Sequence, residues 1–139
     1  MGEDWGKFKV AERILCMGRS HFGPRKIKSL QNYPAIWDLI MILYQQFKVA
    51  KDLWKDKRAD IIQDSILTET EIKKRLEARG RNIDIRKLKK LLASLSEGET
   101  DYTSDFNKNK LVIKEGDCIW RISIPLANAL LKQYPKGFP

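Results

Sequence analysis

The residues best suited to chemistry in this sequence form a cluster of cations within a short segment that has helical periodicity. They are Arg86, Lys87, Lys89 and Lys90. Guanidinium and ammonium groups are hydrogen-bond donors that bind phosphate well. From residue 79 to residue 95 the only acid is Asp84, so little negative charge opposes them. These residue types in this pattern predict the binding of a polyanion.

The charge balance of the whole chain favours the same kind of partner. The 139 residues include 27 Lys and Arg against 18 Asp and Glu, which gives a formal net charge of +9 at pH 7. A basic excess favours nucleic acid because cationic side chains displace the counterions condensed on phosphates. Many basic proteins bind no nucleic acid, however, so the prediction depends on where the cations lie.

Two short helices joined by a tight turn are predicted to position these cations. Thr68 and Glu71 have the spacing of a capping box, which marks the start of the first helix. Gly80 stands where that helix would end, and Asp84 is a natural N-cap for the second helix. The apolar stripe of the second helix is Ile85, Leu88, Leu91, Leu92 and Leu95. The outward positions are Arg86, Lys90 and Ala93, flanked by Lys87 and Lys89. This is the helix-turn-helix pattern.

Further cations on the first helix and the turn extend the predicted surface. They are Lys73, Lys74, Arg79 and Arg81, for which we expect contacts to the nucleic-acid backbone. Sequence readout is expected from Arg86 and Lys90. The alternative is a solvated surface, but such surfaces normally mix positive and negative side chains.

A β-hairpin is predicted after the two helices. Residues 111–114 and 118–124 are rich in strand formers, and Glu115, Gly116 and Asp117 form the expected turn. Lys108 and Lys110 precede the hairpin. Because the turn is acidic, it is poorly suited to touching phosphate, and a purely structural hairpin is the alternative.

The rest of the chain divides around this unit. Pro34 suits the first turn of a long helix that reaches Trp54 and carries two apolar rows, as a core helix or a dimer seam would. Residues 1–33 form a basic segment with a short helix expected over 8–17, either a nucleic-acid-binding arm or a solvated connection. Pro125 begins a short apolar helix in residues 125–139, which Pro135 ends. The expected fold class is mainly α with a small β-hairpin.

Residues 34–124 resemble the winged helix-turn-helix superfamily of DNA-binding domains. The resemblance rests on the motif at residues 67–72, the helix at 84–95 and the hairpin at 111–124. It implies that Arg86, Lys87, Lys89 and Lys90 enter the major groove, with Lys108 and Lys110 near the flanking backbone or minor groove.

The expected function is sequence-specific binding of double-stranded DNA by a homodimeric transcriptional regulator. One alternative is a winged-helix subunit that binds protein or RNA inside a larger complex. A second is a DNA-binding protein of plasmid or virus replication or partition. The long apolar helix and the apolar C-terminal stretch are what a subunit of a complex would present.

Enzymatic function finds little support in the sequence. His21 is the only histidine, and there is neither a CxxC pair nor a phosphate-binding glycine loop. We therefore expect no enzyme, no metal, no cofactor and no small-molecule ligand. A nuclease whose metal ligands are Asp and Glu is the catalytic alternative, because such ligands assemble only in three dimensions.

Cysteine usage and hydropathy indicate an intracellular protein, either cytoplasmic or nucleoid-associated. Cys16 and Cys118 are predicted to be two buried free thiols rather than a disulfide. The most apolar run, residues 35–44, is about half of the ~20 residues that span a bilayer. The sequence does not open with the basic-then-apolar pattern of a signal peptide.

Overall fold

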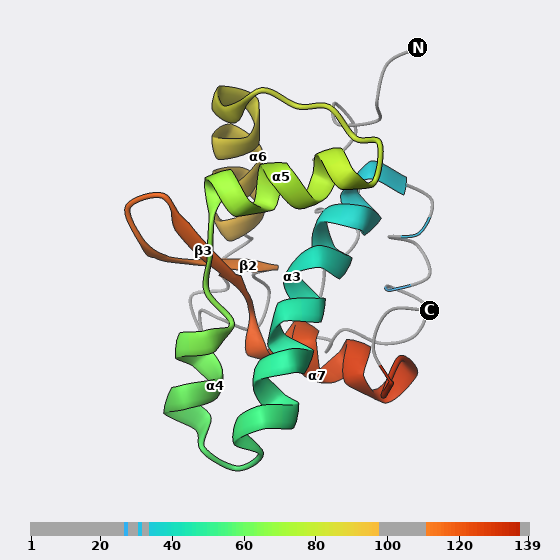
Figure 1. The fold of residues 1–139 in the computed structure, drawn as a ribbon, viewed down its shortest axis with the longest axis vertical. Helices are drawn as coiled ribbons and strands as arrows, with labels where there is room; N and C mark the ends of the chain where they lie inside the picture. Colours follow the sequence, from blue (N-terminus) through green and yellow to red (C-terminus); the bar gives the residue numbers. More distant parts are fainter. Residues whose placement is uncertain (1–26, 28–30, 32–33, 98–110, 137–139) are drawn as a thin grey trace.

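Helices make up most of the fold, and a small antiparallel sheet completes it (Figure 1). The computed structural model describes residues 27, 31, 34–97 and 111–136. Its elements are α3 (Pro34–Trp54), α4 (Arg58–Asp64), β1 (Leu67–Thr68), α5 (Glu69–Ala78), α6 (Ile85–Glu97), β2 (Val112–Gly116), β3 (Ile119–Ile122) and α7 (Ile124–Gln133). The expected class, mainly α with a small β part, is confirmed. The basic segment and its expected helix at 8–17 lie outside the described residues, apart from positions 27 and 31.

Helix α3 is the centre of the core. It begins at Pro34, as predicted, and packs against α4, α5, β3 and α7. In Figure 1 it runs through the middle of the molecule, with α5 near its start and α4 near its end. Its buried residues are Ala35, Ile36, Leu39, Ile40, Met41, Ile42, Leu43, Tyr44, Phe47 and Ala50. Two large apolar side chains near the end of the helix are exposed to solvent. Val49 is 53% exposed and Leu53 is 65% exposed. Most of α3 is therefore a core helix.

The sheet has the strand order β1-β3-β2, and both pairs are antiparallel. The predicted hairpin corresponds to β2 and β3, with Val112 opposite Ile122. Strand β1 adds a third member, because Leu67 pairs with Trp120 and Thr68 with Ile119. As a result β3 is the central strand, and its alternating side chains Trp120 and Ile122 point into the core.

The hairpin turn lies later in the chain than the expected turn at residues 115–117. Strand β2 continues to Gly116, with an irregularity between Lys114 and Gly116, and the turn falls at Asp117 and Cys118. Cys118 has a φ of 60°, a left-handed conformation that a tight turn requires. The extra residue in the bulge determines which residues form the turn. The alternation of apolar and polar residues does not reveal where that extra residue lies.

Cys118 is a free cysteine, but it is exposed. The prediction of two buried thiols is therefore wrong for this residue, because the turn carries it outside the sheet. Cys16 lies outside the described residues.

Helix α4 fills the connection between α3 and β1. It has seven residues, of which only Ile61 is buried. Two polar contacts hold its end against α3: the Trp54 indole N–H donates to the Asp64 carboxylate, and Gln46 Nε2 donates to the Asp64 carbonyl at 2.8 Å. A helix this short with one buried residue has no apolar stripe in its sequence, so it could not be predicted from the sequence.

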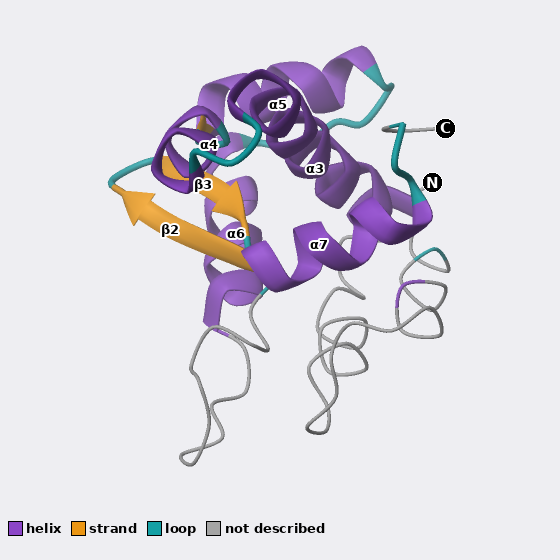
Figure 2. Cartoon of the chain, turned by 90° about the horizontal axis from the view of Figure 1, so that it is seen from below, coloured by secondary structure: helices purple, strands orange, loops and turns teal. Residues whose placement is uncertain are grey.

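Helix α7 belongs to the same core as the rest of the described chain. It begins at Ile124, and its buried residues are Leu126, Ala127 and Leu130. The Tyr44 hydroxyl of α3 donates to the Tyr134 carbonyl at 2.6 Å, directly after α7. The Trp37 and Tyr134 rings meet edge to face, with their centroids 5.9 Å apart. The short helix predicted for residues 125–139 is thus packed onto α3 (Figure 2).

The protein is expected to lose stability in alkali when the Tyr44 hydroxyl ionises. Burial, and then the charge of Asp52, raise the pKa of Tyr44 from 10.0 to about 12. Since the folded-state pKa is the higher one, this contribution is fully present below about pH 10 and is lost as the pH rises through about 12. We expect the free energy of unfolding to fall by about 2 kcal/mol more in the wild type than in Tyr44→Phe over this range. Urea unfolding followed by circular dichroism measures both, and equal pH profiles would contradict the assignment.

Candidate nucleic-acid interface

Helix α5 is fixed at both of its ends by local hydrogen bonds. At the start, the Thr68 side chain accepts from the Glu71 N–H at 3.1 Å, which confirms Thr68 as the N-cap. At the end, Gly80 has a φ of 78°, and its N–H donates to the Glu77 carbonyl at 2.9 Å. The Arg81 N–H donates to the Leu76 carbonyl at 2.9 Å, which completes a Schellman motif. The tight turn predicted from Gly80 is present.

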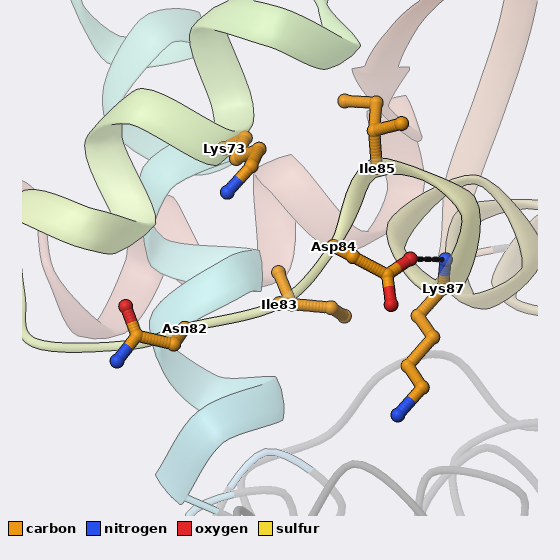
Figure 3. A pocket seen from close by; sticks show the side chains of 6 residues that line it. All are labelled: Lys73, Asn82, Ile83, Asp84, Ile85 and Lys87. Atoms are coloured by element: carbon orange, nitrogen blue, oxygen red, sulfur yellow. Dashed lines mark hydrogen bonds between the residues drawn. The ribbon is translucent and has the colours of Figure 1, made fainter.

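Helix α6 begins at the cap that the sequence predicted. The Asp84 carboxylate accepts from the Lys87 N–H at 2.9 Å (Figure 3). The leucines at 88, 91, 92 and 95 are buried, which fixes the rotation of the helix. At the other end, the Leu111 N–H donates to the Leu95 carbonyl at 3.3 Å and joins α6 to the hairpin.

The outer face of α6 presents the predicted cations to solvent. Arg86, Lys87, Lys89 and Lys90 are all exposed. In the part of the chain that the structure describes, none of these four side chains has an ion-pair partner. Ala93 departs from the prediction: it is half-buried and packs against the core rather than facing outward. The spacing of residues along the helix predicted that Ala93 faces solvent. Because its side chain is small, it fits at the edge of the leucine stripe instead.

Arg79 and Arg81, in the turn, are bound to the core helix. Arg81 Nε donates to Asp38 Oδ2 at 2.8 Å, and Arg79 Nη1 lies 3.4 Å from Asp38 Oδ1. Asp38 is half-buried in α3 among apolar residues, so its charge is compensated by these guanidinium groups. Both arginines thus have a structural task besides the backbone contacts predicted for them. An acid within an apolar helix was the signal in the sequence that a cationic partner exists.

The two lysines of α5 differ in their surroundings. Lys73 lies 3.3 Å from Glu77, one turn further along the same helix, whereas Lys74 is exposed. Exposed pairs of this spacing are weak, so Glu77 does not prevent Lys73 from meeting a phosphate. Arg75, which was not among the predicted site residues, pairs with Glu71 at 3.0 Å and with Gln46 of α3 at 3.1 Å.

An open cleft of about 490 Å³ lies where α5 meets the start of α6 (Figure 3). Lys73 borders it from α5, and Lys87 borders it from α6. Ile83 and Ile85 supply an apolar surface between these cations, and Ile85 is 41% exposed. Asn82 and Asp84 complete the lining, so the cleft combines cationic, acidic and apolar groups.

The hairpin is attached to the start of α5. The Glu69 N–H donates to the Cys118 carbonyl at 3.0 Å, and the buried Trp120 indole N–H donates to Glu69 Oε1 at 3.0 Å. Desolvation, with the carboxylates of Asp117 and Glu69, raises the pKa of the Cys118 thiol, while Lys89 opposes the shift. The hairpin turn therefore lies within electrostatic range of the cationic face of α6.

The charges of the hairpin itself are mixed. Glu115 is bound by Arg121, whose Nε lies 2.6 Å from Glu115 Oε1, while Asp117 is exposed. Lys114 Nζ lies over the Trp120 ring, 5.7 Å from its centroid. This is within the distance at which a cation and an aromatic ring attract each other. Lys108 and Lys110 lie outside the described residues, so the structure does not place them.

Comparison with models of known protein families, with curated proteins and with solved structures gave no match. Among the described residues, no three His, Cys, Asp or Glu side chains are grouped as metal ligands would be. None of the described helices has both the length and the apolar composition needed to cross a membrane. The clearest chemical feature of the described surface is the set of cations on α6.

Proposed function

We propose that this protein binds double-stranded DNA in a sequence-specific manner through the outer face of α6, as a winged helix-turn-helix regulator of transcription. The observation that carries the proposal is the exposure of Arg86, Lys87, Lys89 and Lys90 on one helix whose leucines are buried. A helix presented in this way fits the major groove, where cationic side chains reach phosphates and guanine edges.

The order of elements supports the proposal. The central helix α3 is followed by α5 and α6, which are joined by a Schellman turn, and then by the hairpin. The short α4 is inserted after α3. The hairpin lies beside the start of α5, so it is placed to flank a duplex lying along α6. The acidic turn at Asp117 favours a structural role for the hairpin over phosphate contact.

The first turn of α6 supports base readout in particular. Ile85 is exposed and lines the cleft together with Lys73 and Lys87. Its side chain is suited to apolar contact with a thymine methyl group. Arg86 follows it directly and can donate two hydrogen bonds to a guanine edge. Lys73 and Lys74 of α5 then serve as contacts to the backbone.

We propose that the protein acts as a homodimer, since two half-sites give the affinity that one short helix lacks. The exposed Val49 and Leu53 at the end of α3 are apolar side chains available to a second copy.

The test of this function is fluorescence anisotropy of labelled duplex fragments at rising salt, with single-stranded DNA and RNA hairpins as matched probes. We expect duplex to bind most tightly, with log K falling by about 0.9 per log unit of salt for each phosphate contacted. Light scattering of the complex gives its stoichiometry. Preferential binding of RNA would favour the RNA-binding alternative. Absence of duplex binding at physiological salt would refute the proposal.

A further inference from the structure

A second cavity lies between α4, the hairpin and the start of α7, and its volume is about 210 Å³. Its polar lining comes from Arg58 of α4, Arg121 of β3, Ser123 at the N-cap of α7 and Asn128 within α7. Ile62 and Ile113 contribute apolar walls. In Figure 1, α4 and α7 lie at the end of α3 opposite to α5, so this cavity is separate from the cleft at α6.

Ser123 has a hydroxyl with no hydrogen-bond partner among the residues that the structure describes. Its N–H donates to the Leu111 carbonyl at 3.0 Å, and its carbonyl accepts from the Ala127 N–H at 2.9 Å. The residue is 0% exposed, yet its Oγ makes no hydrogen bond. Buried hydroxyls are normally satisfied, so this one calls for an explanation.

The hydroxyl of Ser123 is not used to cap the helix that follows. Ser123 is the N-cap of α7, but its side chain does not cap the helix. An N-cap hydroxyl usually accepts from the second or third N–H of its helix. Here the second helical residue is Pro125, which has no N–H, and the hydroxyl does not accept from the third, Leu126, either. The buried hydroxyl is thus without a hydrogen bond, and Ser123 is among the residues that line the cavity.

Two guanidinium groups border the same cavity. The Arg121 side chain is 12% exposed, and it donates from Nε to Glu115 and from Nη1 to the Ile122 carbonyl at 3.2 Å. A guanidinium has about five N–H donors, so most of them remain for another acceptor. Arg58 is exposed and has no ion-pair partner within the described ranges.

The start of α7 adds to this positive environment. The helix has ten residues, and its first turn contains no acidic residue. The first N–H groups of a helix carry partial positive charge, which favours an anion. The cavity volume of about 210 Å³ exceeds the roughly 30 Å³ share of a single water molecule.

We propose that this cavity binds a small oxyanion, the phosphate or carboxylate group of a small molecule, through Arg58, Arg121 and the Ser123 hydroxyl. The bound group joins α4, β3 and α7, so it stabilises the folded protein. The site is independent of the DNA-binding surface proposed above, and neither depends on the other for its test.

The test is thermal unfolding of the full chain in inorganic phosphate, in acetate and in chloride at matched ionic strength. We expect a saturable rise in melting temperature with phosphate or acetate that chloride does not give. In Arg58→Gln and in Ser123→Ala we expect the apparent affinity for the anion to fall about 10- to 100-fold. Lys136→Gln, which also removes one positive charge from an exposed position outside both proposed sites, is the matched control and should keep the wild-type response.

Three outcomes would overturn the site. They are equal stabilisation by chloride, an equal loss in Lys136→Gln, and an unchanged response in both cavity variants. Duplex binding by Arg58→Gln distinguishes a free oxyanion from a nucleic-acid phosphate, because the proposal requires its DNA affinity to match the wild type. Circular dichroism of Ser123→Ala and Arg58→Gln establishes that both fold.

Discussion

Replacement of Arg86 and Lys90 together by alanine is expected to weaken duplex binding about 30- to 1,000-fold at constant salt. Both side chains are exposed on the outer face of α6, where a helix lying in the major groove would meet phosphates and base edges. Their loss removes about 2 to 4 kcal/mol of binding free energy while leaving the buried leucines in place. The salt slope should also fall, by about 0.9 for each of the two cations that neutralises a phosphate besides reading a base.

Fluorescence anisotropy at several salt concentrations measures both quantities, and a matched variant separates position from charge. Lys132→Ala/Lys136→Ala removes the same two charges from exposed positions in and after α7. This control should keep nearly all of the affinity. Equal losses in the two variants would mean that net charge, not the face of α6, governs binding. Wild-type binding by Arg86→Ala/Lys90→Ala would assign the contact to other basic residues.

Replacement of Trp120 by alanine is expected to lower the free energy of unfolding by about 3 to 5 kcal/mol. The side chain is 1% exposed and lies on the central strand of the sheet. Its indole N–H donates to the buried carboxylate of Glu69, so the variant leaves both a cavity and an unpaired buried acceptor. A loss of this size is a large part of the total stability of a small domain.

Chemical denaturation followed by circular dichroism measures the loss, and two variants divide it. Trp120→Phe keeps most of the packing but removes the N–H donor, so an intermediate effect is expected. Glu69→Gln keeps an acceptor for the indole and should cost about 1 kcal/mol or less. If Trp120→Ala unfolded at the same denaturant concentration as the wild type, β3 would not be the core strand described here.

The helix-turn-helix could be predicted from the sequence because its signals are local. Thr68 and Asp84 cap their helices through bonds to residues three positions away, and Gly80 adopts the left-handed conformation that few other residues tolerate. The leucine stripe of α6 then determines which residues face outward. Four of the predicted site residues are accordingly exposed on one face.

The features that the sequence did not reveal depend on distant partners or on short elements. Strand β1 has two residues, too few for an alternating pattern, and it exists because β3 lies beside it. The pairing of Asp38 with Arg79 and Arg81 joins positions about forty residues apart. The backbone of Ser123, whose hydroxyl is unsatisfied, is held by its N–H donating to the Leu111 carbonyl twelve positions earlier, which no local motif announces.

The position of β1 has a consequence for how the chain folds. Its partner on β3 lies more than fifty positions later, since Leu67 pairs with Trp120. Helices α5 and α6 lie between them and form from local contacts, whereas joining β1 to β3 requires a long loop to close first. The helix-turn-helix is therefore expected to form early in refolding. Completion of the sheet is the slow step that anchors it to the hairpin.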